Sequence, residues 1–492
     1  MNKSNSLNRR NFLAKSAAAL AAVPYIVMET ALGRSGKVAL AEEPSQGKDS
    51  RPNIVLIISD DHGLADSNCY GNKAVRTPNI DRIANEGVRF DFAFCASTLC
   101  SPARAVIDSG LMPFRNGGHV FGGYVKPDIK TLAKYFNEIG YQTALFGKFS
   151  MHPNASFPYE VVMKKWKPAD HDVGLVDGLN KFLAKRKTDR PLLLEINTAD
   201  THQPWVENEG YELGKIKVPP YLIDTPETRD ALADYYSSVN TLDKTIGNIL
   251  SVLDKHGYNK NTVLIYTSDH GPNLAFAKWC IYDTGIRVPF LVRWPGVVKA
   301  NTSTDAMISH ADIMPTLLEA AAGAVPENLD GKSLLALLKA KKTTHRDVIF
   351  ATHTGQRRQY PAWKLNKCPA RTIRTKTHKY ILNLNPTAKF ITHITACNPK
   401  RQPSAYHPYW DSWVKLAETD AAAKKRVHEY YYRPQHELYD LRKDPFELEN
   451  IADRPENAEL LKSLQEKLKA WREKQADTVP VCLDGSYVPP NR

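Results

Sequence analysis

The sequence lacks any basic run interleaved with aromatic residues and contains no RNA- or DNA-binding motif. Its formal charge of +13 therefore does not indicate a nucleic-acid partner, and a positive excess of this size suits an anionic substrate. There is no C-x-x-C pair to predict a zinc site, and no apolar run long enough to span a membrane. A chain of 492 residues, 42% hydrophobic and 24% charged, is typical of one large globular domain plus a smaller one.

The first 41 residues resemble a twin-arginine export signal. Arg9 and Arg10 precede a weakly apolar run from Ser16 to Met28, and the small residues at 39–41 suit cleavage. We expect residues 1–41 to be a Tat-type signal peptide recognised by the Tat export machinery, and the mature protein to be periplasmic or secreted. The alternative is a basic tail followed by an amphipathic helix.

Apolar runs alternate with helical patterns over most of the chain. Buried strands are predicted at 53–59, 141–146, 191–196, 262–267 and 289–292. Helices are predicted at 77–84, from about Cys100 to Gly110, at 130–139, 227–256 and 311–322. This alternation predicts an α/β fold with a mostly parallel sheet between helices.

The pattern changes beyond about residue 345. Shorter strands are predicted at 371–374, 379–384 and 437–441, and a closing amphipathic helix at 457–474. We expect a small antiparallel sheet with a packed helix, and we place the domains at 42–365 and 366–492.

Polar side chains follow the ends of several predicted strands, where open α/β sheets bind ligands. They are Asp60 and Asp61, Lys148, His202, and Asp269 with His270. Adjacent buried carboxylates imply a cation, and oxygen ligands suit calcium or magnesium. Taken singly, a solvated turn, a structural histidine or a surface lysine is an equally simple interpretation.

The segment from Cys100 to Gly110 reads CSPARAVIDSG. Pro102 fits the first turn of a helix and Gly110 fits its end, so Cys100 is expected at a helix N-terminus. Such a position lowers a thiol pKa and could activate a thiolate. A half-buried structural cysteine is the alternative. Pairing among the other cysteines is open, because spacing cannot assign it; they are Cys69, Cys95, Cys280, Cys368, Cys397 and Cys482.

Cys-Ser-Pro-x-Arg followed by glycine resembles the signature of the type I sulfatases of the alkaline phosphatase superfamily. The resemblance implies an alkaline-phosphatase-like α/β sandwich, with a large mixed, mostly parallel sheet between helices. The resemblance implies that a formylglycine-generating or maturase enzyme oxidises Cys100 to formylglycine, whose hydrate is the nucleophile. It implies Arg104 as the stabiliser of that residue, Lys148 and Lys278 as sulfate contacts, and His202 as the acid for the leaving group. It also implies Ca²⁺ or another divalent metal at Asp60, Asp61, Asp269 and His270, beside the Cys100 side chain.

Two positions depart from the family pattern. His270 stands where the family commonly has asparagine, which leaves the metal open because imidazole is a softer ligand than an amide oxygen. Ser150 stands where the family usually has a histidine, and the nearest histidine is His152. We expect His152 to be the candidate for the role of assisting sulfate release.

The C-terminal part resembles the heparan N-sulfatases (sulfamidases) more specifically. The matching positions are 225–226, 428–433, 437–440, Asp444, Pro445, Glu447, Asn450 and 481–485. This implies an exo-acting pocket for a sulfated, heparan-like glycan, closed by residues 366–492, with 42–365 as the catalytic domain.

Candidates for sugar or carboxylate contacts are His353, Arg357, Arg358 and Arg371, with solvated surface as the alternative. A phosphodiester or phosphonate hydrolase of the same superfamily is the competing function, and a non-catalytic glycan-binding protein is a third. A homodimer is left open.

Overall fold

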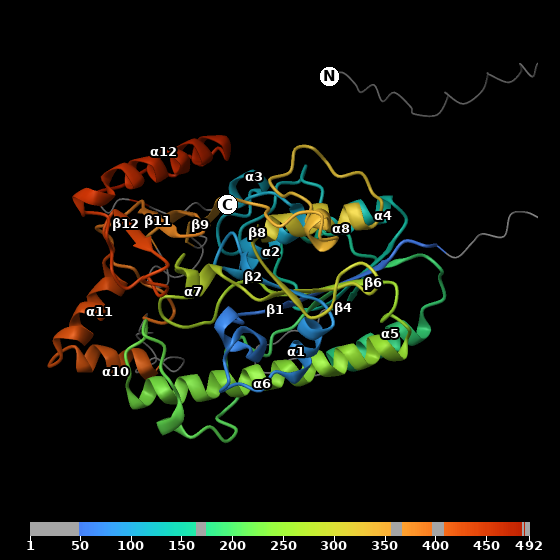
Figure 1. Cartoon of the computed structure of the whole chain (residues 1–492), viewed down its shortest axis with the longest axis horizontal. Coiled ribbons are helices and arrows are strands. Elements are labelled where there is room, and N and C mark those ends of the chain that lie inside the picture. The colour runs from blue at the N-terminus through green and yellow to red at the C-terminus, as the bar shows by residue number, and fades with distance from the viewer. Residues whose placement is uncertain (1–48, 164–173, 356–366, 396–407, 485–486, 488–492) are drawn as a thin grey trace, which may run out of the picture. The chain divides into compact units, whose positions relative to one another are not determined.

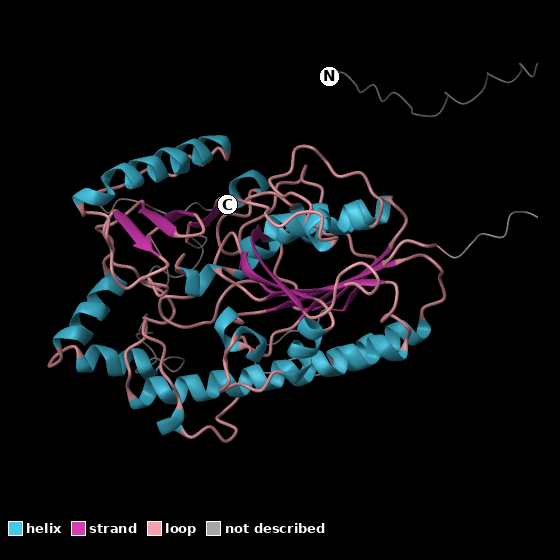
Figure 2. Ribbon diagram, in the orientation of Figure 1, coloured by secondary structure: helices cyan, strands magenta, loops and turns pink. Residues whose placement is uncertain are grey.

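The computed structural model describes residues 49–163, 174–355, 367–395, 408–484 and 487. The predicted signal peptide at 1–41 lies outside these residues. Residues from Lys48 onward form one compact unit with two β-sheets, which Figures 1 and 2 show. Within the described part of the chain, no helix combines the length and apolar character needed to cross a membrane.

The larger sheet has eight strands in the order β4-β3-β5-β1-β6-β7-β2-β8. The strands are β1 (Asn53–Ser59), β2 (Val88–Phe94), β3 (Gln142–Gly147), β4 (Val161–Met163), β5 (Leu192–Asn197), β6 (Thr262–Ser268), β7 (Phe290–Arg293) and β8 (Thr302–Ser309). Neighbours from β4 to β6 are all parallel, whereas β7 runs antiparallel to both β6 and β2. The predicted mixed, mostly parallel sheet is confirmed.

Helices cover both faces of this sheet, as Figure 1 shows. One face carries α1 (Pro78–Asn85), α5 (Leu175–Lys185) and α6 (Pro226–Lys255); the other carries α2 (Cys100–Ser109), α4 (Leu132–Glu138) and α8 (Ile313–Ala320). Strand β1 explains the arrangement, because Ile54, Leu56 and Ile58 pack into one core cluster, and Val55 and Ile57 into the other. A strand buried on both faces reads as a continuous apolar run.

The smaller sheet is antiparallel throughout, in the order β12-β11-β10-β9. Its strands are β9 (Ile349–His353), β10 (Ala370–Arg374), β11 (His378–Asn383) and β12 (His436–Asp440). The C-terminal part also contains α10 (Pro408–Leu416), which contacts α6, α11 (Ala421–Tyr431), which contacts α10, and α12 (Ala458–Lys474), which contacts the sheet. Helix α12 packs Leu464, Leu468 and Trp471 against Ile373 and Tyr380 of the sheet. The predicted small sheet with a packed helix is confirmed, and the domain boundary at 365/366 stays a prediction.

The sequence analysis did not predict strands β2, β4, β8 and β9, nor helices α5, α10 and α11. Strand β2 carries Arg89 and Asp91 among its apolar residues, and the first half of β8 is polar and partly exposed. Neither segment shows the apolar run by which the central strands were recognised. The short helices α3 (Pro113–Asn116), α7 (Asp283–Ile286) and α9 (Leu335–Leu338) were not predicted either.

Strands β3, β5, β1 and β6 are consecutive neighbours and all parallel. Their carboxyl ends therefore lie along one edge of the sheet. That edge is where an open α/β sheet binds its ligands.

Candidate active site

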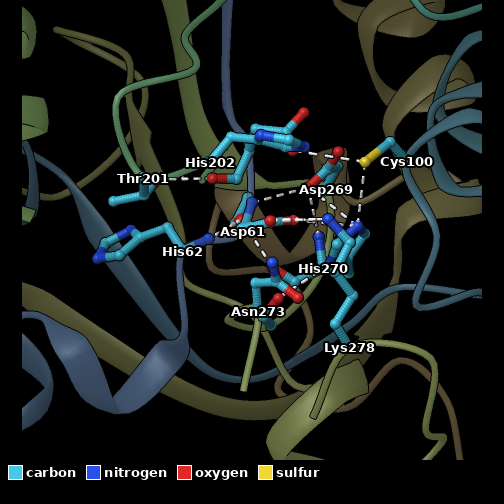
Figure 3. A network of polar contacts seen from close by, with 12 residues as sticks. Asp61, His62, Cys100, Thr201, His202, Asp269, His270, Asn273 and Lys278 are labelled. Carbon is cyan, nitrogen blue, oxygen red and sulfur yellow. Dashed lines mark hydrogen bonds and ion pairs between the residues drawn. The ribbon is translucent and has the colours of Figure 1, made fainter. Parts of the chain in front are cut away.

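Two pairs of polar residues meet at the ends of β1 and β6. Ser59 pairs with Ser268 in the parallel register, so Asp60 and Asp269 emerge side by side. The Asp269 amide donates to the Ser59 carbonyl (2.9 Å), and the Asp61 amide donates to Asp269 Oδ1 (3.3 Å). Figure 3 shows the side chains of Asp61, Asp269 and His270 gathered beside Cys100.

Asp61 has a left-handed backbone, with φ at +62°. Aspartate tolerates this region better than most residues other than glycine. The Tyr235 hydroxyl donates to the Asp61 carbonyl (3.3 Å) and supports this turn. The turn thus presents two successive carboxylates at the sheet edge.

The carboxylates and imidazoles form groups that could hold a cation. Ligand atoms lie within 4.8 Å of one another in three sets: Asp61, Cys100 and His270; Asp60, Asp61 and His202; and Asp60, Cys100 and Asp269. The His270 Nδ1 atom lies 2.9 Å from the Gly271 carbonyl. The Gly271 carbonyl orients Nδ1 as the donor, so Nε2 is the ring nitrogen that faces the carboxylates and the one that would bind a metal.

The electrostatics of the two adjacent aspartates differ. Burial raises the pKa of Asp61 to about 6, with Asp60 and Asp269 adding to the shift and the Lys278 ammonium opposing it. Burial also acts on Asp60, but the charge of Lys148 and that of Arg104 outweigh it and hold the pKa of Asp60 well below its usual value. A divalent cation would relieve the crowding at Asp61, so the donor set fits one.

Cys100 is the first residue of α2 and is 2% exposed. Its Sγ lies 3.4 Å from Asp60 Oδ1 and 3.4 Å from His270 Nε2, and Lys148 Nζ donates to it from 3.5 Å. Burial, reinforced by Asp60, raises the pKa of the thiol well above its ordinary value. The predicted helix start is confirmed, and of the two interpretations left open for Cys100, its burial favours a neutral thiol over an activated thiolate.

Arg104 lies one turn further along α2 and is completely buried. Its guanidinium donates in three directions: Nη2 to Asp60 Oδ2 (3.0 Å), Nε to Asp269 Oδ2 (3.1 Å) and Nη1 to Asn197 Oδ1 (2.6 Å). The rigid planar fork of an arginine can fix three partners at once. Arg104 therefore ties the end of β1 to the ends of β6 and β5.

Two lysines complete the charge balance. Lys148, directly after β3, lies 2.5 Å from Asp60 Oδ2, and Lys278 lies 2.7 Å from both Asp61 oxygens. Ion pairing outweighs burial and raises the pKa of both lysines. Both ammonium groups are therefore charged at neutral pH.

His202 lies in the loop after β5, with Nδ1 2.7 Å from the Gln203 carbonyl. Burial and the charges of Lys148 and Lys278 hold the pKa of this imidazole well below its ordinary value. The ring is therefore neutral, with its proton on Nδ1. One of its ring nitrogens lies within 4.8 Å of a carboxylate oxygen of Asp60 and of one of Asp61.

The two positions that depart from the family pattern lie in the loop after β3. His152 is exposed, and its ring centroid lies 5.8 Å from that of Tyr124. Ser150 Oγ is buried and has no hydrogen-bond partner within the described part of the chain. The role predicted for His152 stays a prediction.

The predicted sugar contacts divide into two groups. Arg371 is fully buried and donates to both Asp477 oxygens (2.7 and 3.1 Å) and to the His353 carbonyl (2.7 Å). It is therefore not a solvated surface residue, and its guanidinium is engaged within the protein. The His353 ring lies between those of Trp279 and Phe390. Arg357 and Arg358 lie outside the described residues.

The structure adds residues that the sequence analysis did not single out. Asn197 bonds Arg104, and Thr201 Oγ1 donates to the Asp60 carbonyl (2.6 Å). Asn273 accepts from His393 (2.7 Å) and donates to Gln203 (2.8 Å). A polar residue at the carboxyl end of a buried strand was the available signal for Asn197.

Two family models match the chain. Residues 52–324, more than half of the chain, match the sulfatase model, and residues 271–406 match a model described as N-sulphoglucosamine sulphohydrolase, C-terminal. An ulvan-active sulfatase of Formosa agariphila is 29% identical over 453 residues, covering 90% of this chain and 84% of its own. The human N-sulphoglucosamine sulphohydrolase is 27% identical over 486 residues, covering 89% and 93% respectively.

Solved structures share the fold. A protein in complex with its substrate D-glucosamine-2-N,6-O-disulfate aligns with a TM-score of 0.65 and 21% identity, over 87% of this chain and 99% of its own. A phosphonate monoester hydrolase of Agrobacterium radiobacter aligns with a TM-score of 0.63 and 19% identity, over 86% and 96%. These neighbours confirm the predicted alkaline-phosphatase-like fold. From the match over residues 52–324, the chain belongs to the sulfatase family and is a sulfuric ester hydrolase.

Proposed function

We propose that this protein removes sulfate from the end of a sulfated, heparan-like glycan, as an ester or as an N-sulfate. The observation that carries the proposal is the meeting of three aspartates and His270 with Cys100, Arg104, Lys148 and Lys278 at one sheet edge. Support for the substrate class comes from the C-terminal family match and from the human relative. The ester reaction takes up water and yields an alcohol and hydrogen sulfate; the N-sulfate reaction yields an amine and hydrogen sulfate.

The nucleophile in this proposal is Cys100 after oxidation to formylglycine, whose hydrated aldehyde supplies an attacking oxygen. The Cys100 Sγ position already has Asp60, His270 and Lys148 within 3.5 Å. An oxygen at that position would meet the same three groups, one of which can accept a proton and one of which is a fixed cation. Attack on a sulfate sulfur needs both kinds of partner.

A divalent metal, calcium or another ion, fits the donor set of Asp60, Asp61, Asp269 and His270, and its chemistry would be that of a Lewis acid. The chain's own cations do the rest. Lys148 and Lys278 bring two buried positive charges to the site. Preorganised charges of this kind stabilise the negative charge that develops on a transferred sulfuryl group.

His202 is the proposed proton donor to the leaving group. The Gln203 carbonyl accepts from Nδ1, so His202 can act as the acid only when Nε2 also carries a proton, which it then gives to the sugar oxygen or nitrogen. The burial that lowers its pKa would be offset by the negative charge of a bound sulfate. A leaving group that needs no proton should bypass His202.

The role of His202 as proton donor has a direct test. His202→Gln should lower kcat/KM for a sugar sulfate by about 10²–10³, the usual worth of a general acid. For a nitrophenyl sulfate, whose leaving group needs no proton, the same variant should lose far less. Equal losses on both substrates would contradict the role.

The C-terminal part is connected to the site by a series of hydrogen bonds. His393 bonds Asn273, Asn273 bonds Gln203, and Gln203 adjoins His202. This chain of contacts links the C-terminal part to the loop of the proposed proton donor.

The experiment that tests the function is sulfate release from defined mono- and disaccharides carrying N-, 2-O- or 6-O-sulfate, beside an aryl phosphodiester. Release from a terminal N-sulfated or O-sulfated glucosamine is expected. Faster turnover of the phosphodiester would favour the competing phosphodiester or phosphonate hydrolase. Cys100→Ala should abolish release, whereas Cys95→Ala, a matched buried cysteine outside the site, should keep it.

Export, maturation and oligomeric state belong to the same proposal. Residues 1–41 would direct export through the Tat machinery to the periplasm or beyond, and a maturase would modify Cys100. Mass spectrometry of the Cys100 peptide from the native host tests the modification. Fractionation with Arg9 and Arg10 changed to lysine tests the export, and light scattering tests the homodimer.

A further inference from the structure

A second polar cluster lies behind Arg104, away from the sheet edge. It consists of Asn197, Glu195, Tyr159 and Asp108, and each of these side chains is at most 7% exposed. We propose that Asp108 is a neutral carboxylic acid that, through Tyr159, Glu195 and Asn197, fixes the orientation of Arg104 in the active site. The proposal rests on the proposed function only in assuming that Arg104 serves the reaction.

The contacts form an unbroken series. Asp108 Oδ1 lies 3.1 Å from the Tyr159 hydroxyl, which lies 2.5 Å from Glu195 Oε2. The other Glu195 oxygen accepts from Asn197 Nδ2 (2.6 Å). Asn197 Oδ1 accepts from Arg104 Nη1 (2.6 Å).

Counting hydrogens shows that one of the two acids must be protonated. The Tyr159 hydroxyl has one hydrogen but lies between two carboxyl oxygens. If Asp108 and Glu195 were both ionised, three oxygens would share that single hydrogen and one contact would be purely repulsive. A proton on one carboxyl group removes the conflict, because that group then donates to the tyrosine oxygen.

The partners of the two acids assign the proton to Asp108. Both Glu195 oxygens accept hydrogen bonds, from Tyr159 and from Asn197, as an ionised carboxylate requires. Asp108 Oδ2 is buried and has no partner in the described part of the chain. A dry, unpartnered oxygen is tolerable on a neutral acid but very costly on a carboxylate.

The charges around Asp108 point the same way. It faces the carboxylate of Glu195, the phenol of Tyr159 and, one turn back on α2, the guanidinium of Arg104. Burial raises the pKa of Asp108 well above its usual value, and the charge of Glu195 adds to the shift. The tyrosine hydrogen bond and Arg104 oppose that shift without cancelling it. Burial also raises the pKa of Glu195, but hydrogen bonds from Tyr159 and Asn197 and the charge of Arg104 oppose it there, so the hydrogen-bond pattern decides between the two acids.

The arrangement positions Arg104 because each link fixes the next. Ionised Glu195 attracts the amide nitrogen of Asn197 and so turns its oxygen toward Arg104. With the Asn197 amide reversed, two donors would face each other. Cys100, Arg104 and Asp108 are spaced four residues apart on α2, so they share one helix face. Asp108, Tyr159, Glu195 and Asn197 are therefore positioning residues.

The test begins with Asp108→Asn. The amide can donate to the tyrosine oxygen as a protonated acid does, so kcat for the best sulfated substrate should fall far less in Asp108→Asn than in Asp108→Ala, which removes this donor. Glu195→Gln, the matched change on the ionised partner, should lower kcat by about tenfold or more with little change in KM, because Arg104 loses its fixed orientation. A melting temperature close to the parent's would separate positioning from stability.

Infrared spectroscopy gives a readout independent of catalysis. At about pH 8, buried acids with moderately raised pKa values are ionised; they include Asp66 (about 6) and Glu447 (about 7). A protonated carboxylic acid C=O band should persist there and vanish in Asp108→Asn. Should that variant not fold, Tyr159→Phe, which removes the hydrogen-bond partner, should shift the band instead.

Two results would overturn the proposal. One is the absence of any such band in the parent protein at that pH. The other is a loss of more than about tenfold in kcat for Asp108→Asn with an unchanged melting temperature, equal to the loss for Glu195→Gln. Failure of the proposed function would look different: no sulfate release by the parent, with the infrared band still present.

Discussion

At the scale of single residues, Arg104 has the most constrained geometry in the site. Its three donor directions hold Asp60, Asp269 and Asn197, which come from three different strand ends. A lysine carries the same charge but has one nitrogen on a flexible stem. Arginine at this position therefore serves to fix distances between strands as well as to supply charge.

Arg104→Lys should lower both stability and activity. At least two buried acceptors would lose their donor, and breaking a buried ion pair of this kind costs about 3–5 kcal/mol. Denaturant unfolding and kcat on the best sulfate substrate are the measurements. Arg115→Lys is the control, because Arg115 is about a quarter exposed in its ion pair with Asp330. A substituted enzyme with parental stability and turnover would contradict this reading of Arg104.

Lys278→Ala should reduce kcat/KM by about 10²–10³, the loss expected for one preorganised charge in a dry site. The side chain bonds both oxygens of Asp61 at 2.7 Å, so its removal also leaves that carboxylate without its cation. Steady-state kinetics on one sulfate ester suffice. Lys376→Ala, at an exposed ion pair with Asp305, should change nothing measurable.

The sequence predicted many of the residues that line the site but not the buried residues that position Arg104. Asp60, Asp61, Lys148 and Asp269 were found because each directly follows an apolar strand. Glu195 and Asn197 lie within such a strand, where a polar residue gives no sign of which neighbour it faces. Their partners Tyr159 and Asp108 come from distant segments, and only the folded chain brings them together.

At the scale of elements, one buried ion cluster joins the two sheets. Asp283, at the start of α7, contacts Arg374 of β10 (3.0 Å) and Lys379 of β11 (3.1 Å). Glu447 shares Lys379 (3.0 Å) and accepts from the Asp283 amide (2.5 Å). The small sheet is therefore fastened by charge to the segment that follows Lys278.

Glu447 should make stability depend on pH. Burial, with Asp283 adding and Lys379 opposing, raises its pKa from 4.5 to about 7. Between about pH 4.5 and 7 the folded protein holds a proton that the unfolded chain releases, so this group's contribution is present at low pH and is lost as pH rises. The loss amounts to about 3 kcal/mol at most.

Unfolding of the parent and of Glu447→Gln across that pH range measures the effect. The difference between them should shift in favour of the variant as pH rises. Glu449→Gln, at an exposed neighbour, should give a difference that does not change with pH. A flat difference for Glu447→Gln would contradict the assignment.

The elements that sequence predicted are those with a single strong signal. Strand β1 is a continuous apolar run because it is buried on both faces, and α6 shows helical spacing over its whole length. Strand β8 gave no such signal, because its first half alternates between exposed and partly buried residues at the edge of the sheet. An edge strand such as β8 forms because it pairs with a neighbouring strand, and the sequence does not show which strand that is.

At the scale of the whole molecule, a bound divalent cation should stabilise the fold. A ligand that binds only the folded state adds about 2.7 kcal/mol to the free energy of unfolding when its concentration is a hundred times its Kd. A chelator should therefore lower the melting temperature and abolish activity, and calcium, magnesium or manganese added in turn should show which ion restores both.

Two matched variants distinguish cation binding at the site from a general effect of ionic strength on the melting temperature. Asp61→Asn should weaken the response of the melting temperature to the restoring ion, because it removes one carboxylate of the donor set. Asp305→Asn, at the surface, should keep the full response. A melting temperature indifferent to the chelator would refute a structural role for the cation.

The burial of Cys100 determines when the residue could be modified, relative to folding. Only 2% of the residue is exposed, so in the folded protein its β-carbon is out of reach of a second enzyme. Oxidation by a separate enzyme would have to finish while the nascent segment is still loose, ahead of any transport of a folded cargo. A molecule that folds before Cys100 is oxidised would stay inactive. The rate of oxidation relative to the rate of folding, rather than the affinity of the oxidising enzyme, would then set the active fraction.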